Sequence, residues 1–110
     1  MGGSGGLKDT YELSINSKTV TKKCDMLIEK YFHSLCKHGY LIFSIGGWDS
    51  SKVSTNDCER YDSKNDKWVS LPNLLYARYW CAAFNFNNEW VYALGGKDGD
   101  PINKVERLSI

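Results

Sequence analysis

The feature that most constrains the fold of this chain is an internal repeat. Two apolar runs end in glycine pairs, and the pair Gly46–Gly47 matches the pair Gly95–Gly96 at an offset of 49. The segment Tyr11–Val20 aligns with Glu59–Trp68 at an offset of 48. The offset changes only between apolar stretches, as expected for a repeated unit whose insertions lie in loops. The sequence therefore predicts tandem copies of one supersecondary unit.

Each copy predicts four short antiparallel strands. Runs rich in aromatic and β-branched residues alternate with clusters of Asn, Asp, Gly, Lys and Ser. Residues 84–94 predict a hairpin that turns at Asn87–Asn88, and residues 61–68 predict another that turns near Asn65–Asp66. A helix over residues 25–37 is rejected, because the matching segment of the next copy has the pattern of a loop and a strand. We expect an all-β chain.

Charge and apolar patterning exclude several functions. The 110 residues carry a formal net charge of +1, which predicts no binding to nucleic acid or to an acidic membrane surface. The longest apolar runs are too short to cross a bilayer. Residues 1–6, with the sequence MGGSGG, predict a flexible engineered linker. We expect a cytoplasmic protein.

The four cysteines predict packing rather than chemistry. None of them forms a C-x-x-C pair, so the usual spacing of a zinc site is missing. Apolar residues stand opposite Cys36 and Cys58 in the aligned copies, and Cys81 stands opposite His33. We expect Cys24, Cys36, Cys58 and Cys81 to be reduced, mostly buried small hydrophobic residues, with no metal site.

Together these marks resemble the kelch repeat of β-propellers. A kelch repeat ends its second strand in Gly-Gly, follows with an acidic and an aromatic residue, and then places a tryptophan. The complete copy continues with Leu71-Pro72 and Arg78, whereas in the earlier copy Val20 replaces the tryptophan and Lys30 the arginine. The structural marks of the repeat are Gly46, Gly47, Gly95, Gly96, Glu59, Tyr61, Trp68 and Glu106.

The resemblance implies blades of four strands, named a to d from the central channel outward. Residues 7–24 would then supply strands c and d of a first blade, 25–72 a complete blade, and 73–110 strands a to c of a further blade. A propeller usually needs four to eight blades. Two explanations stay open: an architectural piece of a longer kelch adaptor, such as a ubiquitin-ligase substrate receptor, or a ring made by several copies. Free strand edges tend to pair, which favours self-association.

The resemblance also implies where a partner would bind. In the family, contacts come from the loop after Gly-Gly and from the residues that follow the arginine. Aromatic and arginine side chains are common binding hot spots. We expect a non-catalytic module that binds a protein or peptide partner. The alternative is that Trp80 and Phe32 point into the core and that the loop charges are only solvated. The predicted partner-binding residues are Trp48, Asp49, Lys97, Asp98, Arg78, Tyr79 and Trp80, with Lys30, Tyr31 and Phe32 in the earlier copy.

Two kinds of chemical site find little support. Some kelch-like propellers are copper oxidases, which need several His and Tyr ligands, but this chain has only His33 and His38. The glycine pairs lack the G-x-x-x-x-G-K-[ST] pattern of a phosphate-binding loop, and a strand rather than a helix follows them. We therefore predict no catalytic residues, no cofactor and no metal.

Overall fold

The chain is all-β throughout the part that its structure describes. The computed structural model describes residues 10–14, 17–28, 30–49 and 51–109, and the linker expected at residues 1–6 lies outside them. Within these residues there is no helix, so the rejection of a helix over residues 25–37 is confirmed for the described part of that segment. The prediction of an all-β antiparallel fold is also confirmed.

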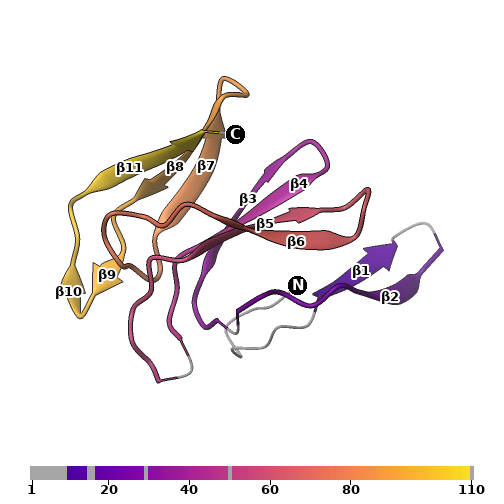
Figure 1. The fold of residues 1–110 in the computed structure, drawn as a ribbon, viewed down its shortest axis with the longest axis horizontal. Helices are drawn as coiled ribbons and strands as arrows, with labels where there is room; N and C mark the ends of the chain where they lie inside the picture. Colours follow the sequence, from indigo (N-terminus) through magenta and orange to yellow (C-terminus); the bar gives the residue numbers. More distant parts are fainter. Residues whose placement is uncertain (1–9, 15–16, 29, 50, 110) are drawn as a thin grey trace.

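The strands form a series of separate antiparallel sheets (Figure 1). A hairpin comes first, followed by a four-stranded sheet whose strands lie in sequence order, and then by a three-stranded sheet in the order β11-β8-β7. The bounds are β1 (Thr10–Ser14), β2 (Thr19–Lys23), β3 (Ser34–His38), β4 (Leu41–Ile45), β5 (Cys58–Asp62), β6 (Lys67–Leu71), β7 (Ala82–Phe86), β8 (Trp90–Leu94), β9 (Lys97–Asp98), β10 (Asp100–Pro101) and β11 (Val105–Ser109).

The sheets repeat at the offsets found in the sequence. The offset between the first residues is 48 for β3 and β7, 49 for β4 and β8, and 47 for β5 and β11. The hairpin β1–β2 matches β5–β6 at an offset of 48 for both strands. The β5–β6 register pairs Tyr61 with Trp68, and the β1–β2 register pairs Leu13 with Val20 at the corresponding place. Each sheet is therefore a copy of one unit, with different strands present.

The turns follow the local sequence. The β7–β8 hairpin turns through Asn87 and Asn88, whose φ angles are 55° and 56°, a conformation that Asn tolerates better than most residues. The β5–β6 hairpin turns through residues 63–66, with Asp66 at φ 52°. One element was not predicted: Lys97–Pro101 forms the small hairpin β9–β10 around Gly99. A two-residue strand is too short to leave a periodic pattern in the sequence.

The main core lies between the four-stranded and the three-stranded sheets. The side chains that form it alternate along the strands of both sheets, as period-two burial requires. A smaller core packs Met26 against Tyr61 and Trp68 on the other face of the four-stranded sheet. Three of the four cysteines are buried and all four are free thiols, as expected for packing residues. The main core consists of Cys36, Phe43, Ile45, Cys58, Leu74, Cys81, Val91 and Ala93.

The second glycine of each pair lies against the backbone of a neighbouring segment. Gly47 has φ 111°, and a Cβ there would lie 2.6 Å from the carbonyl oxygen of Tyr31. Gly96 has φ 89°, and a Cβ there would lie 2.6 Å from the carbonyl oxygen of Tyr79. A carbonyl oxygen fixed in a β-bridge cannot move aside, so both positions need glycine for space as well as for conformation.

We expect Gly47→Ala to destabilise the chain by at least about 3 kcal/mol, because it adds a backbone clash to an unfavourable φ. The matched control is Gly39→Ala, where φ is +59° but no atom lies within 4 Å of the added Cβ. That variant should cost only about 1–2 kcal/mol. Urea denaturation of both variants measures the difference, and equal costs would show that the close approach is unimportant.

Candidate functional site

The residue after each glycine pair is held by the same backbone bridge in both copies. Trp48 and Tyr31 exchange two backbone hydrogen bonds, with N···O distances of 2.7 and 3.0 Å. Lys97 and Tyr79 exchange two equivalent bonds, both at 2.9 Å. The glycine pairs therefore place Trp48 and Lys97 at equivalent points of the two loops, although their side chains differ in chemistry.

These loops bring together an aromatic cluster, which we define as Phe32, Trp48, Tyr79 and Trp80. The ring centroids lie 5.0 Å apart for Phe32–Trp48 and Phe32–Trp80, 5.1 Å for Trp48–Tyr79 and 5.2 Å for Tyr79–Trp80. Their edge-to-face geometry is the one that aromatic quadrupoles favour. The ammonium group of Lys97 lies 5.6 Å from the centroid of Trp80. The structure thus gathers five of the residues predicted to bind a partner.

Two members of the aromatic cluster have an unusual backbone. Phe32 has φ 52° and Trp80 has φ 56°, in a region where residues other than glycine are uncommon. The two positions are equivalent in the repeat, and the Trp80 N–H donates to the Phe32 carbonyl oxygen at 3.1 Å. Such conformations cost about 1–3 kcal/mol each and are concentrated at ligand-binding sites. Half of Trp80 is nevertheless in solvent, with 55% exposure.

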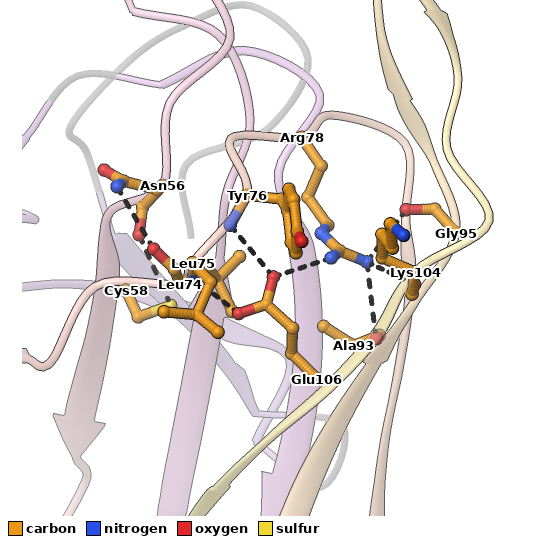
Figure 2. A network of polar contacts seen from close by, with 10 residues as sticks. All are labelled: Asn56, Cys58, Leu74, Leu75, Tyr76, Arg78, Ala93, Gly95, Lys104 and Glu106. Atoms are coloured by element: carbon orange, nitrogen blue, oxygen red, sulfur yellow. Dashed lines mark hydrogen bonds and ion pairs between the residues drawn. The ribbon is translucent and has the colours of Figure 1, made fainter.

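A buried ion pair lies next to the aromatic cluster in the sequence. Arg78, which immediately precedes Tyr79, is fully buried and contacts Glu106 of β11 at 2.6 Å (Figure 2). Its Nη1 also donates to the carbonyl oxygens of Ala93, Gly95 and Lys104. Glu106 in turn accepts hydrogen bonds from the backbone N–H groups of Leu75 and Tyr76.

The earlier copy contains a lysine version of the same arrangement. Lys30 is fully buried, donates to the carbonyl oxygen of Asp57 at 3.0 Å and lies 3.7 Å from the carboxylate of Glu59. The N–H of Leu27 donates to Glu59, as Leu75 does to Glu106. Burial lowers the pKa of Lys30, and the nearby carboxylate of Glu59 opposes that shift. Glu59 is therefore part of a buried pair and not an exposed charge.

The remaining predicted residues divide between surface and interior. Asp98 is exposed in β9, and Asp49 accepts hydrogen bonds from the N–H groups of Ser51 and Val53 within its own loop. Tyr31 lies half-buried at its bridge to Trp48. The side chains of Lys30 and Arg78 point into the molecule, because their carboxylate and carbonyl partners lie there. We therefore leave both out of the partner-binding surface proposed below.

A cavity of about 490 Å³ lies between residues 75–77 and the β9–β10 hairpin with the loop that follows it, and it was not identified from the sequence. Leu75, Tyr76 and Ala77 line one side, and Ile102, Asn103 and Lys104 are among the residues on the other. In the preceding sheet, Thr55 and Asn56 occupy the positions of Ile102 and Asn103. There, residues 74–78 cover them and form three hydrogen bonds with them. The recurrence of Asn56 and Asn103 at an offset of 47 was the available sequence signal.

The described residues offer little for metal or membrane chemistry. No group of three or more His, Cys, Asp and Glu side chains among them is placed to hold a metal ion. No helix in the described part of the chain has the length and apolar character needed to cross a membrane. What the geometry does offer is an aromatic surface beside one lysine.

One four-stranded and one three-stranded antiparallel sheet, each with a glycine pair after its second strand, have the form of partial β-propeller blades. The family model of the Kelch motif matches residues 30–75. The chain is 34% identical over 83 residues to rat Kelch-like protein 38, and 35% identical over 79 residues to Kelch repeat protein C2 of vaccinia virus. It is 28% identical over 97 residues to alpha-scruin of Limulus polyphemus. The chain belongs to the kelch-repeat family.

The matched regions differ greatly in their share of each protein. They cover 74%, 72% and 88% of this chain for Kelch-like protein 38, protein C2 and alpha-scruin, respectively. They cover only 14%, 14% and 10% of those three proteins. The chain thus spans only a small part of the length of each relative.

We predict that the free energy of unfolding depends on pH through Cys58, which lies beside the buried Lys30–Glu59 pair. Burial raises the pKa of this thiol to about 11, from an ordinary value of 9.0. Between pH 9 and 11 the unfolded chain loses the proton and the folded chain keeps it, so stability falls as the pH rises. We expect this thiol to account for a loss of about 2–3 kcal/mol across that interval.

The test compares the wild type with Cys58→Val, since Val105 occupies the equivalent position of the next sheet. Urea denaturation at several pH values from 8.5 to 10.5 should give a shallower decline for the variant. Burial also raises the pKa of Tyr61, so a residual decline is expected in both proteins. An identical slope in the two proteins would contradict the role of Cys58.

Proposed function

We propose that this chain is a non-catalytic protein-interaction module that binds a protein or peptide partner through its aromatic cluster and Lys97. The observation that carries the proposal is the combination of a half-exposed tryptophan with two strained backbone positions at the same place. Trp80 is 55% exposed in spite of its contacts with Phe32, Tyr79 and Lys97. Strain is retained at binding surfaces, where it holds side chains in position for a ligand.

The chemistry of this surface favours a partner with apolar side chains and a nearby acidic group. Tryptophan and tyrosine bury large areas with few rotatable bonds, which makes them common hot spots. Lys97 would contact a carboxylate of the partner at the edge of the cluster. Three buried free thiols agree with a reducing compartment, and we place the module in the cytoplasm.

The test is a selection of peptides from a phage-displayed library on the immobilised chain. Peptides that bind the wild type should bind Trp80→Ala at least tenfold more weakly, because truncation of a hot spot typically costs about 2 kcal/mol or more. Tyr40→Ala is the matched control: Tyr40 is 45% exposed and has Lys64 4.4 Å from its ring centroid, but it lies in the β3–β4 turn.

Binding to the control should change less than twofold. Selected peptides whose affinity depends on Tyr40 and not on Trp80 would overturn the assignment of the surface. The same comparison with Lys97→Ala tests the acidic preference, since peptides that carry a carboxylate should lose more affinity than neutral ones.

We propose self-association as a second function, because one face of the three-stranded sheet carries exposed apolar side chains that no described sheet covers. Phe84, Phe86 and Val105 are 42%, 51% and 56% exposed, and Phe84 stacks on Tyr92 with ring centroids 5.3 Å apart. The residues that correspond to Phe84 and Val105 in the preceding sheet, Cys36 and Cys58, are only 8% and 1% exposed. The three-stranded sheet covers the face of the four-stranded sheet that carries Cys36 and Cys58. A sheet of a second copy would cover the equivalent face of the three-stranded sheet in the same way.

We expect the chain to exceed its monomer mass of 12.5 kDa in light scattering at tens of micromolar. Phe84→Glu should shift the mass towards the monomer, because it puts a charge into the proposed contact. Val53→Glu is the control, since Val53 is 57% exposed but lies in the β4–β5 loop. A wild-type chain that is monomeric at these concentrations would contradict self-association.

A further inference from the structure

Strand β11 has an uncovered edge that its equivalent does not have. In the four-stranded sheet, β5 is paired with β4 on one side and with β6 on the other. Among the described residues, β11 is paired only with β8. Its other edge therefore presents a row of unpaired backbone groups, which are a template for another strand.

The chain already contains a strand of the kind that this edge needs. β2 corresponds to β6 at an offset of 48, and β1 corresponds to β5 and thus to β11. The sequences of β1 and β11 share the pair Leu-Ser at the same place, as Leu13-Ser14 and Leu108-Ser109. β1 and β11 are thus alternative neighbours for the same strand, β2.

The segment after the fourth strand also has a recognisable docking position. Leu74, which follows β6, donates its N–H to the carbonyl oxygen of Asn56 at 2.8 Å. The side-chain amide of Asn56 donates to the carbonyl oxygen of Leu74 at 3.1 Å (Figure 2). A single asparagine thus holds the backbone of one residue at both of its polar groups.

The equivalent position of the last sheet has no such occupant among the described residues. Asn103 corresponds to Asn56, is exposed, and lines the cavity of about 490 Å³ beside Leu75 and Tyr76. Its side chain makes no hydrogen bond to another described residue. Met26 follows β2 as Leu74 follows β6, and it is 2% exposed where Leu74 is 3% exposed. Because Met26 packs on Tyr61 and Trp68, it can keep that packing while its backbone meets a second molecule.

We propose that self-association proceeds by strand exchange, in which β11 of one copy replaces β1 beside β2 of a second copy. The product is a four-stranded sheet, β7-β8-β11 with the second copy's β2, and the backbone of Met26 docks on Asn103. Leu108 then pairs with Val20, and Arg107 pairs with Thr21, as Leu13 and Glu12 do within one copy. The inference rests on the self-association proposed above and specifies its interface.

The exchange is favourable in simple physical terms. The ladder between β1 and β2 is replaced by one of the same length, so the backbone hydrogen bonds are conserved. The apolar face around Phe84 and Val105 is covered in addition. The contact is head-to-tail, so the same interface can be repeated from one copy to the next.

The experiment uses cysteine cross-linking between separately labelled full chains in a Cys24→Ser background. Arg107→Cys mixed with Thr21→Cys should yield a covalent dimer under mild oxidation, because directly paired positions place their Cα atoms about 4.5–5.5 Å apart, within the range of disulfides. Arg107→Cys mixed with Ser70→Cys, an exposed position of β6, should yield none. In addition, Asn103→Ala should weaken association about fivefold in light scattering, and Asn73→Ala should leave it unchanged.

The outcomes separate the two proposals. A monomeric wild-type chain overturns both self-association and strand exchange. An oligomer in which Thr21 cross-links no better than Ser70 overturns strand exchange alone, as does an oligomer that is insensitive to Asn103→Ala. An in-register cross-link together with the Asn103 effect supports the exchange.

Discussion

The buried pair of Arg78 and Glu106 is the interaction on which the rest of the last sheet depends. A guanidinium with no exposed surface is tolerated only when its charge is paired, and removal of one partner of such a pair typically costs about 3–5 kcal/mol. Arg78 donates hydrogen bonds to the carbonyl oxygens of Gly95, after β8, and of Lys104, before β11. The carboxylate of Glu106 accepts hydrogen bonds from the backbone N–H groups of Leu75 and Tyr76. One pair thus fixes three segments, and the residues directly after Arg78, Tyr79 and Trp80, contact Trp48 and Phe32 in the aromatic cluster.

The repeat keeps this scaffold constant while the exposed chemistry varies. Lys30 and Glu59 reproduce the pair with fewer hydrogen bonds, since an ammonium group cannot contact as many carbonyl oxygens as a guanidinium. The glycine pairs and the bridges after them are equivalent in both copies, yet they present a tryptophan in one and a lysine in the other. A substitution at Trp48 or Lys97 can therefore change which ligand chemistry the surface favours, while the glycine pairs and backbone bridges stay the same.

The same repeat accounts for the uncovered surfaces. Cys58 and Val105 occupy equivalent positions, but one is 1% exposed and the other 56%. The difference lies in the neighbour: Cys58 packs against a following sheet in the main core, and Val105 has none among the described residues. Exposure at these positions is thus a property of the arrangement of sheets, and it is the reason that a second copy suits both the apolar face and the edge of β11.

The sequence alone determined the all-β class, the strand offsets and the hairpin turn at Asn87–Asn88, because these depend on local periodicity and on residues that tolerate a positive φ. It also marked the loop residues that the structure brings together. Only the tertiary structure decided that Lys30 and Arg78 lie in the interior, since a charged residue after a loop has no local feature that reveals a buried partner in a later strand. The contact of Phe32 with Trp48 and Trp80 was likewise decided by packing. These rings belong to different loops, and they meet because neighbouring sheets lie against each other. The backbones of Phe32 and Trp80 adopt an unfavourable positive φ at this contact.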